Sequence, residues 1–481
     1  MGYRIVFATL GSLGDVFPYV AIALGLKARG HETILATHAP YRDFLTKIGL
    51  ESVALRPDSM PANVSVSKLL DDRSDASQPV SGQSLVAEIA NTYRDLFEAT
   101  RNADLMVTHS LVLPAPLLAR KTGIPWISVA LAPAYFLPVL DRRMEGVRAW
   151  LQPYLKLETD LGLRPGSDSL IQEQYSSEVV LVLASKLLAG SKSDSPEQLW
   201  MTKVPFLLSR LLTKDHSIRR LRRQIRALPG TLLRLLAKPP QPQWPPHVRF
   251  TGFPFLDHEA IADEAVARLE QFLSDGPAPV VFTLGSSGGQ AAGSFFTESV
   301  EAAKRLRCRA LFLTGTYAVP REIEELQSRD LAVFRYIPYS HVFPRAAVIV
   351  HPAGIGTTAL SLRAGRPMLV VPMSFDQPDT AARMCRLGVA RMIPHAHYQA
   401  RWAAAELRAL RGNPTYASAA ARVRRQINSE EGVSNACDAI EEYLARNRES
   451  NPSRAPNPRY QRIDSASIKT GSSLQDGESA A

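Results

Sequence analysis

Cysteine is scarce in this chain of 481 residues, which contains only Cys308, Cys385 and Cys437. The three lie far apart and none belongs to a C-x-x-C pair, so the sequence indicates neither a disulfide framework nor a zinc site. Long apolar runs are also missing, since no window approaches the roughly 18 apolar residues that a membrane-spanning helix needs. The opening apolar run is too short for a signal peptide, because Gly-Ser-Leu-Gly-Asp interrupts it. We therefore expect a cytoplasmic protein.

Acidic residues are outnumbered by basic ones, and the net charge is +10. Most of the excess comes from residues 186–238, which hold twelve Lys and Arg residues and three Asp and Glu residues. Such a local excess argues for one basic element and against a surface that binds nucleic acid generally. Apolar residues recur there at helical spacing: Ile218, Leu221, Ile225 and Leu228. Two interpretations stay open, a helix that packs on the protein, or an anchor over 190–238 that meets anionic lipid at the inner face of the plasma membrane.

The length exceeds what one hydrophobic core usually supports, so we expect two domains. Strand and helix signals alternate over the first 135 residues and again after residue 277, which indicates parallel sheets with helices on both faces. We predict an α/β fold of two doubly wound, Rossmann-like domains that face each other across a cleft. The predicted boundaries are an N-terminal domain at 1–185, a basic amphipathic insertion at 186–238, a Pro-rich connector at 239–258, a C-terminal domain at 259–446 whose last helices could pack back on the N-terminal domain, and a disordered tail at 447–481.

The first motif, TLGSLGDVFPYVAIALGL, follows the first predicted strand. Gly11 and Gly14 are predicted to let the chain turn tightly, which places Ser12 and Asp15 at the carboxyl end of that strand. One interpretation is structural, because Asp is a favoured residue at a helix N-cap. The other is catalytic, because a carboxylate at this position can take a proton from an acceptor hydroxyl. An anion site in the opposite domain favours the catalytic interpretation.

That anion site is predicted within the second motif, HPAGIGTTALSLRAGRPMLVVPMSFDQ, which runs from residue 351 to residue 377. His351 ends a strand, and the N–H groups of Gly356, Thr357 and Thr358 begin the next helix. Helix N-termini at the carboxyl ends of parallel strands stabilise anions, and these groups are suited to a diphosphate. Since the sequence has no D-x-D pair suited to holding Mg²⁺ on phosphate, we expect dipoles and neutral donors to meet the anion without a metal ion.

The same motif ends in Asp376 and Gln377, which begin a further helix. A carboxylate–amide pair suits the vicinal hydroxyls of a sugar, although Asp376 could instead only cap its helix. An anion site beside a site for a polyhydroxylated group has the shape of a nucleotide-sugar. Two weaker signals accompany it. Ser286 and Ser287 follow a strand and could bond phosphate oxygens, and Tyr336, fixed by a nearby proline, could face a nucleobase or belong to the core.

Together these motifs resemble the nucleotide-sugar-dependent glycosyltransferases of family 1. The similarity is carried by GSLGDVFPYVAIALGLKARGHE and by RYIPYSHVFPRAAVIVHPAGIGTTALSLRAGRPMLVVPMSFDQPDTAARMCRLGV, and it covers roughly 1–185 and 240–446. The branch it resembles contains sterol glucosyltransferases, antibiotic glycosyltransferases and a rhamnosyltransferase. The resemblance implies a GT-B fold, an inverting mechanism that needs no metal, and a donor bound mainly by the C-terminal domain.

The resemblance also assigns roles to individual positions. The matching residues are Asp15 with Ser12 for the general base, Tyr336 near the nucleobase, Gly354, Gly356 and Thr357 for the phosphate turn, and Asp376 with Gln377 for the sugar. In this fold the acceptor pocket is lined by loops of the N-terminal half, here parts of 56–90, 109–116 and 133–180, with His109 and Ser110 as acceptor-binding candidates. One departure matters: the usual His-His-Gly-Gly is His351-Pro352-Ala353-Gly354 here, and Pro352 removes both the second histidine and a backbone donor.

The function expected from sequence is transfer of a hexose, glucose or rhamnose, from a UDP- or dTDP-sugar to a hydroxyl of a lipophilic acceptor. Two alternatives remain. One is a GT-B epimerase or hydrolase, for which the N-terminal motif supplies no clear acid–base pair. The other is a catalytically weak or silent sugar-nucleotide-binding protein, which only the change at Pro352 supports. We expect the nucleotide-sugar to be a co-substrate, and we expect no further cofactor.

Overall fold

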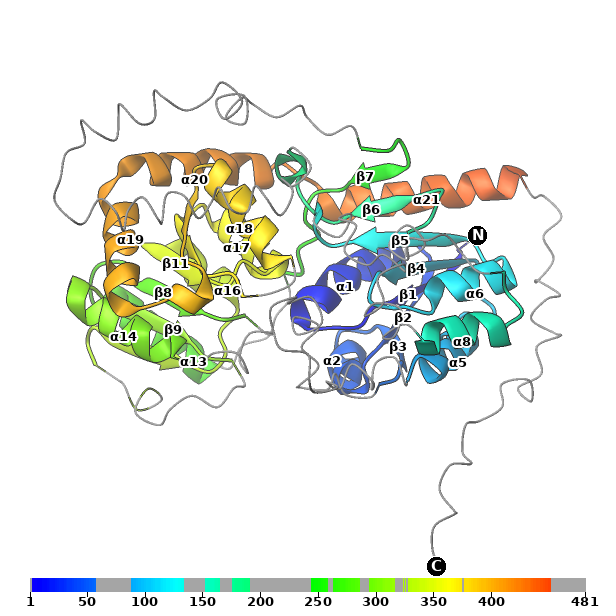
Figure 1. Ribbon diagram of the computed structural model, residues 1–481, viewed down its shortest axis with the longest axis horizontal. Coiled ribbons are helices and arrows are strands. Elements are labelled where there is room, and N and C mark those ends of the chain that lie inside the picture. Colours follow the sequence, from blue (N-terminus) through cyan, green and yellow to red (C-terminus); the bar gives the residue numbers. More distant parts are fainter. Residues whose placement is uncertain are drawn as a thin grey trace, which may run out of the picture.

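The computed structural model describes residues 2–57, 88–133, 152–164, 175–190, 244–257, 263–285, 294–315, 323, 325, 328–373 and 376–450. These residues form two α/β domains that lie side by side (Figure 1). The elements of the N-terminal domain are β1 (Arg4–Ala8), α1 (Leu13–Ala28), β2 (Glu32–Thr37), η1 (Ala39–Tyr41), α2 (Arg42–Lys47), β3 (Glu51–Ala54), α5 (Ile89–Ala99), β4 (Leu105–His109), α6 (Ala115–Thr122), β5 (Trp126–Ala130), α8 (Gln152–Asp160), β6 (Val180–Val182), η3 (Lys186–Ala189) and β7 (Val248–Phe250).

The second domain follows the same plan. Its elements are α13 (Asp263–Ser274), β8 (Val280–Thr283), α14 (Phe295–Leu306), β9 (Ala310–Leu313), β10 (Leu331–Phe334), α16 (Tyr339–Val342), η5 (Phe343–Arg345), β11 (Val348–His351), α17 (Ile355–Ala364), β12 (Met368–Val370), α18 (Gln377–Arg386), β13 (Ala390–Met392), η6 (His395–His397), α19 (Ala400–Gly412), α20 (Pro414–Ile427) and α21 (Gly432–Ser450).

All strands of both sheets are parallel. In each sheet the chain adds strands first on one side of the first strand and then on the other side. The N-terminal sheet has the order β3-β2-β1-β4-β5-β6-β7, and the C-terminal sheet has the order β10-β9-β8-β11-β12-β13. In such sheets the crevice beside the first strand, at the carboxyl ends, is where ligands bind. The motif at 11–15 follows β1, and the motif at 351–358 begins with the last residue of β11, the neighbour of β8. The fold therefore places both motifs at switch points, and it confirms the predicted pair of doubly wound α/β domains.

The strands are apolar because helices cover both faces of each sheet. In β1, Ile5 and Phe7 belong to one hydrophobic cluster, whereas Val6 and Ala8 belong to the cluster on the opposite face. All four side chains are fully buried. A continuous apolar run is what a strand covered on both faces requires.

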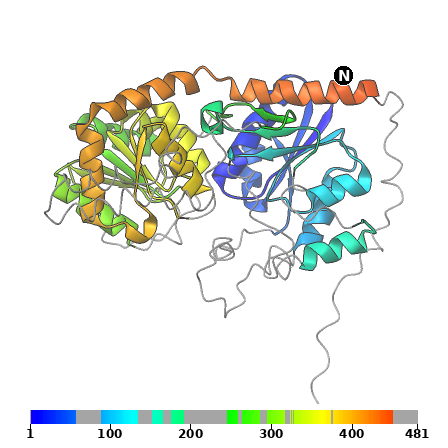
Figure 2. The ribbon, with the colours of Figure 1, turned by 45° about the horizontal axis from the view of Figure 1, so that its top comes forward.

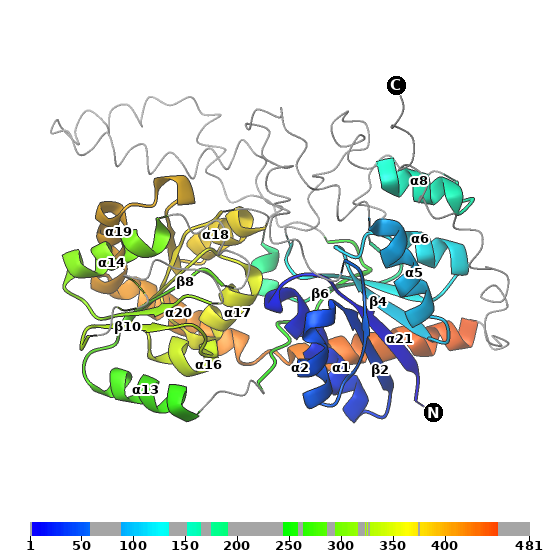
Figure 3. The ribbon, with the colours of Figure 1, turned by 90° about the horizontal axis from the view of Figure 1, so that it is seen from below.

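The last helix of the chain crosses from the C-terminal domain to the N-terminal domain. Figures 2 and 3 show α20 along the C-terminal domain and α21 along the N-terminal one. Apolar residues of α21, among them Cys437 and Ile440, join the cluster that contains the core of α1. Arg29 adds ion pairs to Asp438 and Glu441, both at 2.6 Å. The C-terminal helix thus fastens the two domains together.

Several boundaries differ from those predicted. Residues 248–250, expected within the Pro-rich connector, are the edge strand β7, which pairs with β6. Residues 447–450, assigned to the disordered tail, continue α21. The amphipathic segment at 190–238 lies almost wholly outside the described residues, as does the rest of the tail. Within the described part of the chain, no helix combines the length and the apolarity that crossing a membrane requires.

Candidate active site

The loop after β1 carries Ser12 and Asp15. Ser12 is the N-cap of α1, and Asp15 is the third residue of the helix. One oxygen of the half-buried Asp15 carboxylate, Oδ2, accepts hydrogen bonds from Ser12 N at 2.7 Å and from Ser12 Oγ at 3.0 Å. The capping interpretation is thus half right, because Ser12 is the cap and Asp15 folds back onto it. Within the described part of the chain, Oδ1 of Asp15 accepts no hydrogen bond.

Gly11 gives the Asp15 carboxylate its space. Its φ is +136°, and a Cβ at this position would lie 2.4 Å from Oδ2 of Asp15. Only glycine satisfies both conditions. Gly14 does not make the predicted turn, since it lies inside α1. The prediction for Gly14 was wrong, because the turn between β1 and α1 is complete at the N-cap Ser12 and the helix has already begun at Gly14.

The predicted phosphate turn is the N-terminus of α17. Gly354 is its N-cap, and the N–H of Thr358 donates to Gly354 O at 2.9 Å. The N–H groups of Gly356 and Thr357 precede this first intrahelical bond and point out of the helix end. The prediction that Thr358 offers its N–H to an anion is therefore wrong. Its hydroxyl is buried without a hydrogen-bond partner among the described residues.

His351 is fully buried at the end of β11. Its Nδ1 accepts a hydrogen bond from Ala353 N at 3.1 Å, so the proton of the neutral ring is on Nε2. This Nε2 is buried and has no partner among the residues that the structure describes. Burial lowers the pKa of His351 to about 3, which keeps the ring neutral. His351 can thus donate one hydrogen bond from Nε2, but it cannot bring a positive charge.

The next turn residue, Ala353, adopts a φ of +68° and is fully buried. This left-handed conformation costs an L-residue other than glycine about 1–2 kcal/mol. Ala353 stands where the related motif has glycine. Pro352, which replaces the second histidine of that motif, is also buried. The turn therefore keeps its shape despite both departures, and some backbone strain is stored in it.

Asp376 is the N-cap residue of α18, yet its side chain makes no capping bond to the helix N–H groups. Its Oδ2 is buried and has no hydrogen-bond partner in the described part of the chain. Burial raises the pKa of Asp376 to about 7, and the negative charge of Asp15 adds to the increase. The carboxylate hydrogen-bonds with Thr380 in the first turn of α18, whereas Oδ2 still lacks a donor of the kind that a sugar hydroxyl could supply.

Gln377 is buried beside Asp376. Its Oε1 accepts a hydrogen bond from Met373 N at 2.9 Å. The side chain thus fixes the turn that leads into α18. A sugar contact by Gln377, as predicted, would have to coexist with this structural bond.

The two motifs meet at the boundary between the domains. Figures 1 and 3 place α1 beside α17, and a Cβ built on Gly356 would lie 3.1 Å from Cα of Gly14. The charge of Asp15 contributes to the raised pKa of Asp376, so the two carboxylates lie within electrostatic reach. The structure thus places the predicted base, the predicted phosphate turn and the predicted sugar-binding residue near one another.

The remaining donor candidates lie around the phosphate turn. Tyr336 is 49% exposed in the loop after β10, so the interpretation that it belongs to the core is wrong. Ser286 and Ser287 lie outside the described residues. Gly285, just before them, approaches the donor turn: a Cβ on Gly285 would lie 3.3 Å from Oγ1 of Thr357.

The acceptor candidates His109 and Ser110 follow β4. His109 is buried, and its Nδ1 lies 3.4 Å from Leu10 O in the loop after β1. Burial lowers the pKa of His109, and the charge of Asp15 partly opposes this. Ser110 is half-buried and hydrogen-bonds with Tyr175. His109 therefore lies beneath the base loop, where the structure gives it a supporting contact.

Sequence analysis missed two residues that hold the same loop. His38 follows β2, and its Nε2 accepts a hydrogen bond from Gly11 N at 3.1 Å. The hydroxyl of Tyr41 donates to Gly11 O, also at 3.1 Å. The available signal was position: a histidine directly after β2 lies beside the end of β1 in a parallel sheet, as His109 does on the other side.

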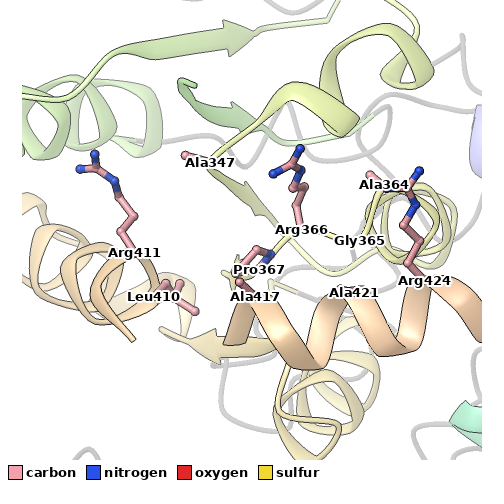
Figure 4. Close-up of a pocket in the computed structure, with 10 residues that line it drawn as sticks. All are labelled: Ala347, Ala364, Gly365, Arg366, Pro367, Leu410, Arg411, Ala417, Ala421 and Arg424. Carbon is pink, nitrogen blue, oxygen red and sulfur yellow. The ribbon is translucent and has the colours of Figure 1, made fainter. Parts of the chain in front are cut away.

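A pocket of about 450 Å³ lies elsewhere in the C-terminal domain (Figure 4). It is bounded by the C-terminal end of α17, the residues before β12 and the helices α19 and α20, and Arg366, Arg411 and Arg424 are among its lining residues. This pocket lies at the amino ends of β11 and β12, whereas His351 and Gly356 lie at the carboxyl end of β11. The pocket is therefore separate from the candidate active site.

Comparisons with known proteins agree with this geometry. Residues 5–95 match the glycosyltransferase family 28 N-terminal domain, and residues 323–442 match the erythromycin biosynthesis protein CIII-like C-terminal domain. The O-mycaminosyltylonolide 6-deoxyallosyltransferase of Streptomyces fradiae is 30% identical over 459 residues, which is 92% of this chain and 97% of the relative. A sterol 3-beta-glucosyltransferase of Saccharomyces cerevisiae is 25% identical over 99% of this chain, which spans 38% of that longer protein.

Solved structures support the fold. A glycosyltransferase of kitacinnamycin superposes with a TM-score of 0.66 at 20% identity, covering 92% of this chain and 100% of the other. The calicheamicin glycosyltransferase CalG4 gives a TM-score of 0.61 at 16% identity, with 93% and 99% of the two chains covered. The chain therefore belongs to the GT-B nucleotide-sugar-dependent glycosyltransferases, in the branch with the antibiotic glycosyltransferases and the sterol glucosyltransferases.

Proposed function

We propose that this glycosyltransferase moves a hexose, glucose or rhamnose, from a UDP- or dTDP-sugar to a hydroxyl of a lipophilic acceptor, with inversion and without a metal ion. The observation that carries the proposal is the contact between the helix of Asp15 and the N-terminus of α17, where a Cβ on Gly356 would lie 3.1 Å from Cα of Gly14. A potential base from one domain lies within electrostatic reach of a buried carboxylate suited to sugar hydroxyls from the other. The bond to be broken would lie between them.

The proposed reaction is a single displacement. Asp15 takes the proton of the acceptor hydroxyl while the hydroxyl oxygen attacks the anomeric carbon of the sugar. The bond from that carbon to the phosphate oxygen breaks, and its electron pair leaves with the nucleoside diphosphate. Because attack comes from the face opposite to the leaving group, the configuration at the anomeric carbon inverts. The anchored Oδ2 of Asp15 fixes the direction of the carboxylate.

The leaving diphosphate is proposed to bind at the N-terminus of α17. The N–H groups of Gly356 and Thr357 and the positive end of the helix dipole supply the stabilisation. Nε2 of His351 is a buried donor without a partner among the described residues, so it fits a phosphate oxygen in the same way. All of these donors are neutral. The number of these neutral donors supports binding of the diphosphate without a cation, although Pro352 contributes no N–H donor.

The acceptor is proposed from the relatives. Their names indicate a glycosylated tylonolide and sterols as acceptors, which are bulky, largely apolar molecules with hydroxyl groups. We infer an acceptor of the same kind, bound by the N-terminal domain near Asp15. Much of the predicted acceptor pocket, including most of 56–90 and 133–180, lies outside the described residues.

A product assay tests the proposal. The full chain is incubated with labelled UDP-glucose or dTDP-rhamnose and with macrolide, sterol, flavonoid and hydroxy-fatty-acid acceptors, with and without EDTA. We expect a glycoside whose anomeric configuration, measured by NMR, is opposite to that of the donor, and an unchanged rate in EDTA. Retention of configuration, or activity lost with the chelator, would contradict the mechanism. Donor binding without any transfer or hydrolysis would support the silent-protein alternative, whereas an epimerised donor would support the epimerase.

Contact with a membrane is a separate proposal, based only on the sequence of 190–238. A basic amphipathic segment at the cytoplasmic face of a membrane would bring the enzyme to a lipid-dissolved acceptor. Flotation with anionic liposomes should recover the full chain at low salt and recover less at high salt, because the attraction is screened over about 10 Å at 0.1 M. Equal flotation after deletion of 190–238 would refute this role.

A further inference from the structure

The loop that precedes α1 contains two consecutive peptide units that are held at both ends. In the first, the carbonyl of Leu10 lies 3.4 Å from Nδ1 of His109, and the N–H of Gly11 donates to Nε2 of His38. In the second, the carbonyl of Gly11 accepts from the hydroxyl of Tyr41, and the N–H of Ser12 donates to the carboxylate of Asp15. Four side chains thus fix the orientation of both peptide planes.

The sheet order explains how these side chains converge. β1 lies between β2 and β4, and His38 and His109 stand at the carboxyl ends of those two neighbours. Each histidine therefore approaches the loop from one side. Tyr41 is one short turn beyond His38, whose carbonyl accepts from the Tyr41 N–H at 3.1 Å. The arrangement follows from the doubly wound topology and from the residues that follow β2.

The hydrogen bonds also define the protonation of the two rings. A backbone N–H only donates, so Nε2 of His38 carries no proton, and Nδ1 of His38 donates to Pro57 O at 2.9 Å. A carbonyl only accepts, so Nδ1 of His109 carries the proton. Both rings are buried, at 4% and 1% exposure. A loop with partners of fixed polarity on both sides has one preferred orientation.

Tyr41 and Asp15 share one peptide unit. The Tyr41 hydroxyl donates to the carbonyl of Gly11 in that unit, and the N–H of Ser12 in the same unit donates to Oδ2 of Asp15 at 2.7 Å. Hydrogen bonds in such a chain polarise one another, so the bond from Tyr41 strengthens the donor that holds the carboxylate. If this peptide rotated, Gly11 would lose the conformation that leaves space for Asp15.

We propose that His38 and Tyr41 are positioning residues that orient Asp15 through the Gly11–Ser12 backbone, without touching either substrate. The inference rests on the proposed role of Asp15 as the base. It predicts loss of turnover without loss of donor affinity, because the donor site lies on the other domain. A misplacement of reacting groups by about 1 Å can lower a rate by about 100-fold.

The test compares matched variants in the full chain. Tyr41→Phe removes only the hydroxyl, and Tyr3→Phe is its control in the same domain. His38→Ala removes the acceptor of the Gly11 N–H, whereas His38→Gln restores an acceptor oxygen. His31→Ala is the control for histidine. Nδ1 of His31 also accepts a backbone hydrogen bond, from Tyr3 N at 3.1 Å, but His31 precedes β2 and so lies at the amino end of the strands, away from the loop of Asp15.

We expect Tyr41→Phe and His38→Ala to lower kcat by about 10- to 100-fold with the donor Kd unchanged. His38→Gln should recover part of the loss. His31→Ala should lower Tm but not kcat, and Tyr3→Phe should resemble the wild type. If His38→Ala fails to fold, Tyr41→Phe and His38→Gln still decide the matter.

A double mutant separates this inference from the proposed function. Tyr41→Phe should cause no further loss in an Asp15→Asn background, because both changes act through one group. Wild-type kcat in Tyr41→Phe and His38→Ala, beside an inactive Asp15→Asn, would refute the positioning role and leave the proposed base intact. Full activity in Asp15→Asn would refute the base and the positioning role together.

Discussion

The loop after β1 and the turn after β11 both lie at the switch points of their sheets, but they are held in opposite ways. In the first loop, side chains of the same domain contact the backbone of residues 10–12, and Asp15 is fixed by Ser12. In the second, Nε2 of His351 and the hydroxyl of Thr358 are buried without partners among the described residues.

The difference suits the different functions proposed for the two sites. A group that must accept a proton benefits from an orientation fixed before substrate binds. A site that must bind and then release a diphosphate benefits from donors that the ligand itself completes, because buried polar groups left unpaired are unfavourable. Changes in the first loop should therefore affect turnover, whereas changes in the second should affect ligand binding. The predictions below test this distinction in order of expected effect.

The largest effect is expected for Asp15→Asn. An amide has nearly the shape of the carboxylate but cannot accept the proton, so kcat should fall by roughly 10²–10⁴, the usual contribution of a positioned base. Donor affinity, measured by calorimetry with the nucleoside diphosphate, should stay near that of the wild type. A variant that turns over normally would remove Asp15 from the mechanism.

Much of this arrangement could be predicted because the sequence patterns are local. In β1 the run RIVFA is almost wholly apolar, and the buried residues of α19 and α20 recur at helical spacing. By contrast, β7 has only three residues and follows a Pro-rich stretch. Its partner β6 is more than sixty residues earlier in sequence, so no local periodicity marks it.

The site was predictable in kind but not in its details. Motif order gave Asp15, Gly356 and Asp376, whose neighbours in sequence identify them. The role of His38 depends on strand adjacency, which appears only when the sheet order is known. Whether the N–H of Thr358 is available depends on where the first helical hydrogen bond forms, and helix boundaries are uncertain by one or two residues from sequence.

A smaller effect, on catalytic efficiency, is expected at the contact between the domains, where the second turn meets the first loop. A Cβ on Gly356 would lie 3.1 Å from Cα of Gly14, so Gly356→Ala should push α17 away from α1. We expect kcat/KM to fall by about 10- to 100-fold. The reciprocal change, Gly14→Ala, meets no atom closer than 3.8 Å and should keep activity. Equal losses in the two variants would show that this contact does not set the position of the phosphate turn.

Asp376 should make donor binding dependent on pH. Its pKa of about 7 means that the carboxyl is largely protonated at pH 6, and sugar hydroxyls donate better to the ionised form. Donor affinity of the wild type should therefore rise as pH increases through about 7, and that of Asp376→Asn should stay flat. Titrations of the donor from pH 5.5 to 8.5 would show this. Because the charge of Asp15 contributes to the raised pKa of Asp376, the midpoint should move to lower pH in Asp15→Asn.

The same group predicts a pH dependence of stability. An unfolded aspartate ionises near pH 4, whereas folded Asp376 holds its proton up to about pH 7. The folded state thus binds more protons between these values, so its free energy of unfolding falls as pH rises through this window. Asp376→Asn lacks this loss and should be the more stable protein at pH 8, by on the order of 1–3 kcal/mol. Urea unfolding at pH 5 and pH 8 measures the difference, and parallel curves for the two proteins would contradict the raised pKa.

The smallest effect is expected at Ala353, where the donor turn departs from a favourable conformation. At a φ of +68°, replacing alanine by glycine removes a penalty of about 1–2 kcal/mol. This gain offsets the loss of one buried methyl and the greater freedom of glycine in the unfolded chain, so Ala353→Gly should leave stability nearly unchanged. Ala359, also buried but inside α17, provides the control, because Ala359→Gly loses the methyl and about 1 kcal/mol of helix propensity. Two equally destabilised variants would mean that the turn holds no strain. A tolerated Ala353→Gly beside a destabilised Ala359→Gly would show that the donor turn, unlike the loop of Asp15, holds its shape at a cost in backbone energy.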